Sequence, residues 1–343
     1  MRRRMLMHTI VLGVTLMMFA GAAAAQYQLK NLASNQEGQA QQPPDPLLVN
    51  AWGLAYAPGG AFWISDEGSG WSTLYNGNGA KQGLRVLIPS ASGAGPGSPT
   101  GIVFNGSSDF KIQGWNTFFL FATLDGTIQG WSPQTNPNQT EMVVNNSSTG
   151  AIYTGLAITS NASGNVLFAA DSSNNKVDMY DGTFKLVKSF TDPTVPAGFT
   201  PFGIQDIDGL VFVAYASNSG GSGGYIDIFS ESGDFVKRFA EGAPLNQPWG
   251  FAAAPGNFGP LSNLLLITNN INKAGTINAF NALTGQFVGV VKDTTGKPIH
   301  IDQLWGIAFG GGTLSDGGKN ELFFTAGPDN NAAGTFGSIS FKP

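Results

Sequence analysis

The sequence contains no cysteine, and only 11% of its 343 residues are charged. The absence of cysteine excludes disulfides, thiolate nucleophiles and cysteine-bound metals, so the folded core alone has to supply stability. The only histidines are His8, in an apolar leader, and His300, which excludes multi-histidine zinc sites. A formal net charge of -5, with no basic run after the leader, argues against nucleic acid as a partner.

The first 25 residues have the features of a secretory signal peptide. A basic head, Met-Arg-Arg-Arg, precedes an apolar run from Ile10 to Ala22 and a small-residue stretch that ends before Gln26. A membrane anchor is the alternative, but a span needs about 20 apolar residues. We therefore expect export to a secreted or periplasmic location, with a soluble, monomeric mature chain that has no membrane span.

One short pattern returns six times along the rest of the chain. In each copy a glycine follows an aromatic residue or a threonine and opens an apolar run, and the copies are spaced by roughly 47 to 56 residues. Further short apolar runs, separated by turns, follow each glycine. Four strands per repeat form the blade of a β-propeller, so we predict one all-β, six-bladed propeller domain over residues 26–343. The six glycines are Gly53, Gly101, Gly155, Gly203, Gly250 and Gly306.

The sixth repeat lacks a fourth strand, because the sequence ends just after its third strand at Ser338–Phe341. A spare strand, Tyr27–Leu32, precedes the first glycine. We predict that this N-terminal strand pairs as the outer strand of the last blade, which closes the ring and protects its edges.

Aromatic residues precede four of the six glycines. The first strand of a blade lies nearest the ring axis, where a glycine permits close approach of neighbouring backbones. The aromatic side chains then have two interpretations: a stacking platform for a ligand at the channel mouth, or packing between neighbouring blades. The candidate ligand-binding residues are these four aromatic residues together with two polar residues that we expect nearby, Tyr153 and Asn246. The full set is Trp52, Tyr153, Phe202, Asn246, Trp249 and Trp305.

Carboxylates and amides are concentrated in loops that we expect on one face of the ring. Asp66, Asp171 and Asn269 supply hard oxygen atoms of the kind that calcium or another divalent cation binds. The alternative is that they stabilise hairpin turns through their own backbone. His300 is the candidate for proton transfer, with Asp302 to orient it, unless it only fills a position at a strand edge.

The repeats also resemble known proteins. Their motifs are Val49-Asn-Ala-Trp-Gly-Leu-Ala55, Ser98-Pro-Thr-Gly-Ile-Val-Phe-Asn105 and Ile301-Asp-Gln-Leu-Trp-Gly-Ile-Ala-Phe-Gly310. Together they resemble a family of uncharacterised secreted bacterial propellers, some of which carry a C-terminal sorting tail that this sequence lacks. More distantly the chain is similar to NHL-repeat and gluconolactonase-type propellers, which include metal-dependent lactone and ester hydrolases as well as binding scaffolds.

These observations favour an exported binding or interaction protein that uses the loop-rich face around the central channel. Its partner would be a small molecule, a glycan or a component of the cell envelope, and the sequence identifies no cofactor beyond the candidate divalent cation. The alternative is a calcium-type hydrolase of lactones or esters, in which Asp66, Asp171 and Asn269 hold the ion. A redox role with a bound quinone is a third hypothesis. The fold by itself does not decide between them.

Overall fold

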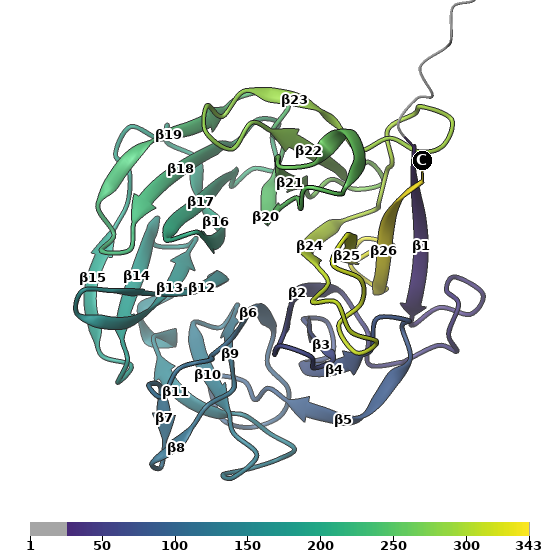
Figure 1. Ribbon diagram of the computed structural model, residues 1–343. Helices are drawn as coiled ribbons and strands as arrows, with labels where there is room; N and C mark the ends of the chain where they lie inside the picture. Colours follow the sequence, from purple (N-terminus) through teal and green to yellow (C-terminus); the bar gives the residue numbers. More distant parts are fainter. Residues whose placement is uncertain (1–25, 343) are drawn as a thin grey trace, which may run out of the picture.

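The computed structural model describes residues 26–342, which form six four-stranded antiparallel sheets around a central axis (Figure 1). The proposed signal peptide, residues 1–25, lies outside the described residues. Within the described part, no helix is long and apolar enough to cross a membrane. The predicted fold, a six-bladed β-propeller with four-stranded blades, is confirmed.

Each blade begins with an inner strand beside the axis and continues outward. The inner strands are β2 (Ala51–Tyr56), β6 (Pro99–Phe104), β12 (Tyr153–Asn161), β16 (Phe199–Ile207), β20 (Pro248–Ala253) and β24 (Leu304–Phe309). The second strands are β3 (Phe62–Asp66), β9 (Phe119–Thr123), β13 (Gly164–Asp171), β17 (Leu210–Ser217), β21 (Leu265–Asn269) and β25 (Glu321–Ala326).

The third strands are β4 (Trp71–Tyr75), β10 (Thr127–Trp131), β14 (Lys176–Asp181), β18 (Tyr225–Ser230), β22 (Thr276–Phe280) and β26 (Thr335–Lys342). The outer strands of blades one to five are β5 (Lys81–Leu87), β11 (Glu141–Asn145), β15 (Leu186–Phe190), β19 (Phe235–Glu241) and β23 (Phe287–Val290). Figure 1 shows these outer strands along the perimeter of the ring.

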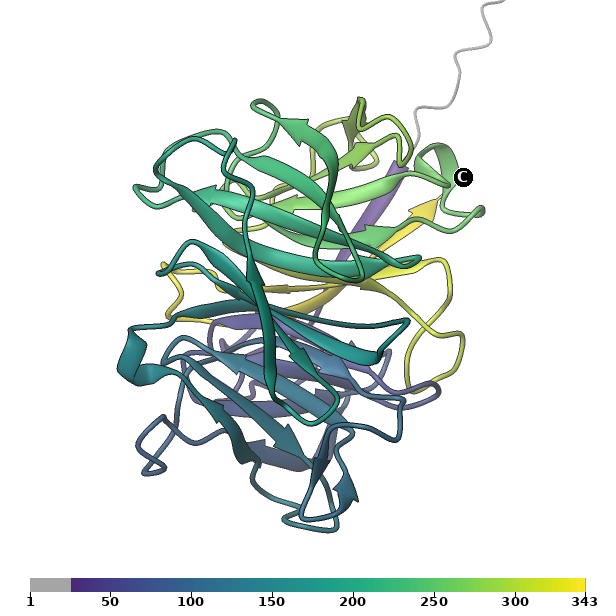
Figure 2. The same ribbon diagram turned by 90° about the vertical axis from the view of Figure 1, so that its left-hand side faces the viewer.

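The N-terminal strand closes the ring as predicted. β1 (Gln26–Ser34) pairs antiparallel with β26 and forms the outer strand of the sixth blade, with Tyr27 opposite Phe341. Both ribbon views show the two strands side by side (Figures 1 and 2). The Tyr27 side chain is buried, and its hydroxyl donates to the Phe258 carbonyl at 2.6 Å, which fastens the closing strand to the neighbouring fifth blade.

The repeated glycines are required by close approach between blades. A Cβ atom on Gly203 would lie 1.9 Å from the carbonyl oxygen of Trp249, and one on Gly250 would lie 2.6 Å from that of Trp305. Neither glycine has a positive φ, so the backbone conformation does not require glycine. Glycine is required because there is no space for a side chain. The inner strands therefore pack backbone against backbone.

Threonine side chains join successive blades at the same level. The Thr268 hydroxyl accepts from the Gly250 amide at 2.8 Å within its own blade and donates to the Trp305 carbonyl of the next blade at 2.9 Å. Thr325 repeats this arrangement between the sixth and first blades. Its hydroxyl accepts from the Gly306 amide and donates to the Trp52 carbonyl. The buried hydroxyls thus satisfy backbone groups that the tight inner packing leaves outside the strand ladders.

A small hairpin inserted between β6 and β9 was not predicted. Its strands are β7 (Lys111–Ile112) and β8 (Trp115–Asn116), joined by Gln113 and Gly114, which both have positive φ. Two central residues with positive φ are typical of the type I′ turn that suits two-residue hairpins. Figure 1 shows the hairpin at the outside of the second blade.

Candidate functional site

Four aromatic side chains meet on the axis and close the channel at one end. Trp52 stacks on Trp305 with ring centroids 3.5 Å apart, and Trp249 meets both edge-on at 6.0 and 5.8 Å. Phe202 packs against Trp52 and Trp305 from the fourth blade. The three tryptophans are at most 8% exposed. They come from blades five, six and one, which follow one another around the ring, and their buried rings pack against one another on the axis. Their role in ligand binding stays a prediction.

Hydrogen bonds fix two of the three indole rings. The Trp305 Nε1 donates to Asn50 Oδ1 at 3.1 Å, and the Trp249 Nε1 donates to the Thr154 carbonyl at 3.0 Å. The buried Trp52 Nε1 finds no acceptor among the residues that the structure describes. The aromatic cluster is therefore held by two polar contacts and by the mutual stacking of its rings.

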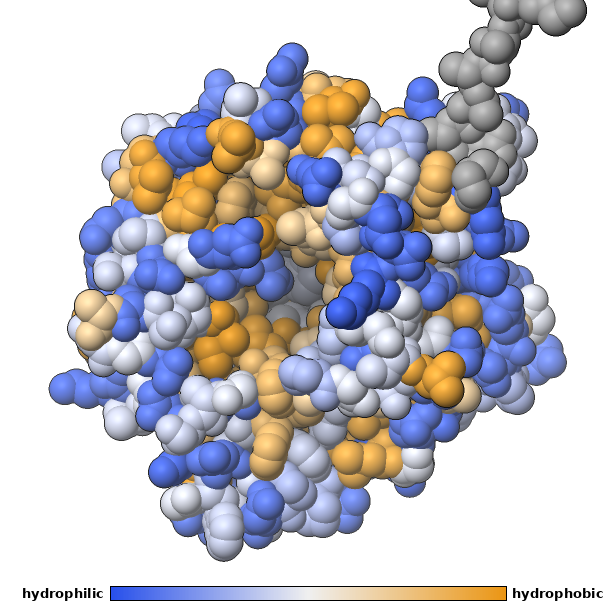
Figure 3. Space-filling model, in the orientation of Figure 1, coloured by the Kyte–Doolittle hydropathy of each residue, from blue (hydrophilic) through white to orange (hydrophobic). Residues whose placement is uncertain are grey.

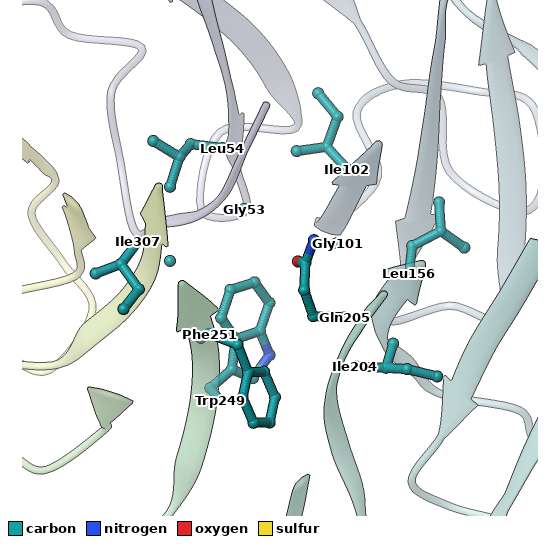
Figure 4. Close-up of a pocket in the computed structure, with 12 residues that line it drawn as sticks. Gly53, Leu54, Gly101, Ile102, Leu156, Ile204, Gln205, Trp249, Phe251 and Ile307 are labelled. Carbon is teal, nitrogen blue, oxygen red and sulfur yellow. The ribbon is translucent and has the colours of Figure 1, made fainter. Parts of the chain in front are cut away.

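Beyond the glycines, the channel widens into a funnel that opens at the opposite face. A cavity of about 30 Å³ lies at the level of the glycines and the Trp249 ring (Figure 4). It leads into a cavity of about 510 Å³, which shares Leu54, Ile102, Phe251 and Ile307 with it. Figure 3 shows a hollow at the centre of one face, bordered by both hydrophobic and hydrophilic residues. Along each inner strand the aromatic residue comes before the glycine and the funnel residues come after it. The funnel therefore opens at the face opposite the loops that lead into the inner strands.

The polar part of the funnel comes mainly from the fourth blade. Gln205 is exposed and reaches toward the axis from β16 (Figure 4), and Asp206 and Asp208 follow it along the rim. Asp208 and Gly209 have positive φ and form the two-residue turn between β16 and β17. The contribution of this turn to a cavity was not predicted from the sequence.

Asp206 has an unusual environment for a carboxylate. Burial raises its pKa above the ordinary value, and the nearby Glu231 and Asp208 carboxylates act in the same direction. The Thr159 hydroxyl and the Gly209 amide partly offset this rise in pKa, while the buried Oδ1 has no close hydrogen-bond partner among the described residues. A buried carboxylate oxygen without a close donor is energetically unfavourable when charged, which agrees with the raised pKa of this side chain.

The three residues predicted to bind a metal lie in blades one, three and five, where each ends a second strand and is bonded to its own blade. Asp66 Oδ2 accepts from the Thr73 amide at 2.9 Å. Asp171 Oδ1 accepts from the Ile152 amide, and Asn269 Oδ1 accepts from the Asn246 amide. Among residues 26–342, no group of three or more His, Cys, Asp or Glu side chains is arranged to hold a metal ion. The metal site stays a prediction.

Asp66 provides a test of that prediction. It is fully buried, and desolvation raises its pKa well above the ordinary value, with a further contribution from the nearby Asp45. The unfolded chain loses the Asp66 carboxyl proton above about pH 4, whereas the folded protein keeps this proton to higher pH. Stability conferred by this proton is present at low pH and is lost as the pH rises toward the folded-state pKa.

We therefore expect Asp66→Asn, which resembles the protonated acid, to raise the melting temperature at about pH 8 and to lose this advantage near about pH 4. Thermal unfolding of both proteins at the two pH values measures the effect. If Asp66 is a calcium ligand instead, calcium will raise the melting temperature of the natural protein and not that of the variant. That result would contradict our expectation.

His300 and Asp302 border one cavity but do not form a hydrogen-bonded pair. Both line a cavity of about 180 Å³ at the sixth blade, which includes β1 as its outer strand. The Asp302 carboxylate accepts from the backbone amides of Lys273 at 2.5 Å and Asp329 at 3.2 Å, so it joins two loops rather than orienting the exposed imidazole. The catalytic role of the two residues stays a prediction.

The remaining two candidate ligand-binding residues lie away from the axial cluster. Tyr153 is fully buried, and its hydroxyl donates to Asp178 Oδ2 at 2.8 Å and bonds the Tyr180 hydroxyl at 2.8 Å. Burial raises the pKa of Tyr153 above its ordinary value. Asn246 is partly exposed, and its backbone amide donates to Asn269. Neither residue lines the funnel, which is bordered instead by residues that follow the repeated glycines.

No family model matches the chain. Two relatives come from Acanthamoeba polyphaga mimivirus. Uncharacterized protein R648 is 31% identical over 338 residues, which cover 92% of this chain and 81% of that protein. Uncharacterized protein L690 is 29% identical over 339 residues, which cover 92% of this chain and 86% of its own length.

Solved structures show the same fold at low sequence identity. A gluconolactonase from Xanthomonas campestris has a TM-score of 0.58 at 13% identity, and the match covers 93% of this chain and 92% of the enzyme. Virginiamycin B lyase from Staphylococcus aureus has a TM-score of 0.54 at 14% identity, covering 92% and 99% of the two chains. These likenesses concern the fold alone, and they confirm the predicted similarity to gluconolactonase-type propellers. By its sequence the chain belongs to the same family as uncharacterized protein R648 of the mimivirus.

Proposed function

We propose that the protein is a binding protein that takes a small ligand in its axial funnel. The observation that carries the proposal is the cavity of about 510 Å³ on the ring axis. Its volume falls within the range of roughly 300–1,000 Å³ that is usual for small-molecule sites. The aromatic cluster forms a closed end, so a ligand would enter and leave through the face opposite the loop-rich one.

The lining indicates the chemistry of the ligand. Most residues along the wall have apolar side chains, such as Leu54, Ile102 and Phe251, but polar atoms make up much of the surface that a ligand would touch, so the ligand should combine an apolar body with polar groups. Asp206 and Asp208 place carboxylates on one side only, where a donor group or a positive charge would be stabilised. We infer a neutral or cationic small molecule with an apolar body and a hydrogen-bond donor at one end.

The proposal includes export. The basic and apolar leader supports a secreted or periplasmic location, in the manner of the secreted bacterial propellers that the repeats resemble. The intact mass of protein recovered from an expressing bacterial culture tests this, because cleavage after residue 25 leaves Gln26 as the first residue. A chain that keeps its first 25 residues would contradict the proposal.

Filling the funnel should abolish binding of an apolar probe. Ala253 is exposed and lines the funnel, so a tryptophan there would project into the cavity without disturbing buried packing. We expect the neutral fluorescent probe N-phenylnaphthylamine to bind the natural protein and to lose affinity by about tenfold or more with Ala253→Trp. Fluorescence titration measures the two dissociation constants.

A matched substitution separates this effect from a general response to added tryptophan. Ala94 is exposed in the loop between β5 and β6 and does not line the funnel. Ala94→Trp should bind the probe as the natural protein does. Equal affinity in all three proteins would show that the probe binds elsewhere and would contradict the proposal.

A further inference from the structure

The β7–β8 hairpin carries a solvent-exposed aromatic side chain on a rigid base. Phe110, just before the hairpin, is fully buried, and its amide donates to the Gly182 carbonyl at 2.7 Å. Thr117, just after it, is also buried and donates from its hydroxyl to the Phe110 carbonyl at 2.6 Å. Between these anchors Trp115 is 55% exposed. A large ring held in water by an ordered support is more typical of a recognition element than of packing.

Trp115 borders a small cavity that is separate from the axial funnel. The cavity has a volume of about 170 Å³ and shares no lining residue with the funnel. Phe118 is 37% exposed and packs on the buried Trp131, with ring centroids 6.4 Å apart. The described residues that line the cavity, none of them charged, are Gly114, Trp115, Asn116, Phe118 and Gln134.

The polar groups of this cavity are amides, and one of them is oriented. The Ser132 hydroxyl donates to Gln134 Oε1 at 2.8 Å, which leaves the Gln134 Nε2 group to donate to a ligand. The exposed Asn116 side chain offers both an amide donor and a carbonyl acceptor. Amides beside an exposed aromatic face, without charge, match a ligand that has an apolar ring face and neutral hydroxyl groups at its edge.

We propose that the cavity beside Trp115, here called the hairpin cavity, binds one sugar ring of a neutral glycan. The C–H face of the ring stacks on Trp115, while its hydroxyls bond to Asn116 and Gln134. The volume is below that of an ordinary small-molecule pocket, which suits a single ring rather than an extended proline-rich peptide. The absence of charge in the lining disfavours anionic glycans. The inference does not depend on the proposed ligand of the axial funnel.

Titration calorimetry with cellotetraose, laminaritetraose and chitotetraose tests the proposal, with a proline-rich peptide as a competing probe. We expect at least one of the neutral tetrasaccharides to bind, and Trp115→Ala to weaken that binding by about tenfold or more. Gln134→Leu should weaken it severalfold, because one oriented donor is lost. Binding should also change the tryptophan fluorescence of the natural protein and not that of Trp115→Ala.

Two controls make the outcome specific. Leu283→Ala removes another exposed apolar side chain, 83% exposed and outside the hairpin cavity, and should leave sugar binding unchanged. Ala253→Trp, which fills the axial funnel, should also bind the sugar normally. Unaltered melting temperatures establish that the variants fold. The proposal is overturned if none of the three sugars binds at about 10 mM, if Trp115→Ala binds as well as the natural protein, or if only the peptide binds.

Discussion

Replacing Gly203 with alanine is expected to prevent stable folding. The new Cβ would lie 1.9 Å from the Trp249 carbonyl oxygen and 2.6 Å from the carbonyl carbon. These are backbone atoms of the adjacent inner strand, so no side chain can rotate away and two blades have to separate. We expect a loss of more than about 3 kcal/mol in the free energy of unfolding, measured by urea denaturation.

Two other glycines provide a graded comparison. A Cβ on Gly155 would meet its nearest neighbour, the Phe202 carbonyl oxygen, at 3.0 Å, so Gly155→Ala should cost less than Gly203→Ala. A Cβ on Gly289, in the outer strand β23, would have no atom within 4 Å, and Gly289→Ala should change stability by less than about 0.5 kcal/mol. Equal stability of the Gly203 and Gly289 variants would contradict the packing account.

Removing a tryptophan from the axial cluster should have the second large effect. Trp305 is 3% exposed, stacks on Trp52 and donates its indole N–H to Asn50. Trp305→Ala leaves a cavity at the centre of the ring and removes the donor to a buried amide oxygen. We expect a loss of about 3 to 5 kcal/mol, visible as a lower melting temperature.

Phenylalanine substitutions separate ring packing from hydrogen bonding in this cluster. Trp305→Phe keeps a ring but loses the bond to Asn50, so it should cost about 1 kcal/mol more than Trp52→Phe. Trp52→Phe removes an N–H group that is buried without an acceptor among the described residues, which offsets part of the lost ring contact. If Trp52→Phe is the more damaging of the two, the assignment of these roles is wrong.

The sequence predicted the blades well because their pattern depends on local rules that repeat. Strands such as β9 (Phe119–Thr123) and β22 (Thr276–Phe280) are short, mainly apolar runs that end at turns, which is the pattern from which the blades were predicted. The glycine before each apolar run was also correctly interpreted as a point of close approach. The pairing of the N-terminal strand followed from counting strands in the last repeat.

Whether a tryptophan of the second blade is exposed or buried could not be predicted from its local sequence. Ile-Gln-Gly-Trp occurs twice, at residues 112–115 and 128–131. In the first copy Gly114 has a positive φ and Trp115 is exposed, whereas the second copy lies in β10 and its Trp131 is buried. The same residues adopt two structures because distant contacts decide between them.

The contacts of the candidate site residues also depend on distant parts of the chain. The two-residue spacing of His300 and Asp302 suggested a pair, but Asp302 accepts from the backbone of two other loops. The aromatic residues were recognised as axial, but only the structure shows that their rings meet and close one end. The open funnel therefore lies on the face that the loop pattern did not indicate.

The proposed function depends most on where a small ligand binds, and a crystal structure of the protein soaked with N-phenylnaphthylamine tests this directly. We predict that the probe lies in the axial funnel, in contact with Phe251 and Ile307 on the side that opens away from the tryptophans. Probe density on the loop-rich face, beside His300 or against the outer side of the aromatic cluster, with an empty funnel would contradict the account.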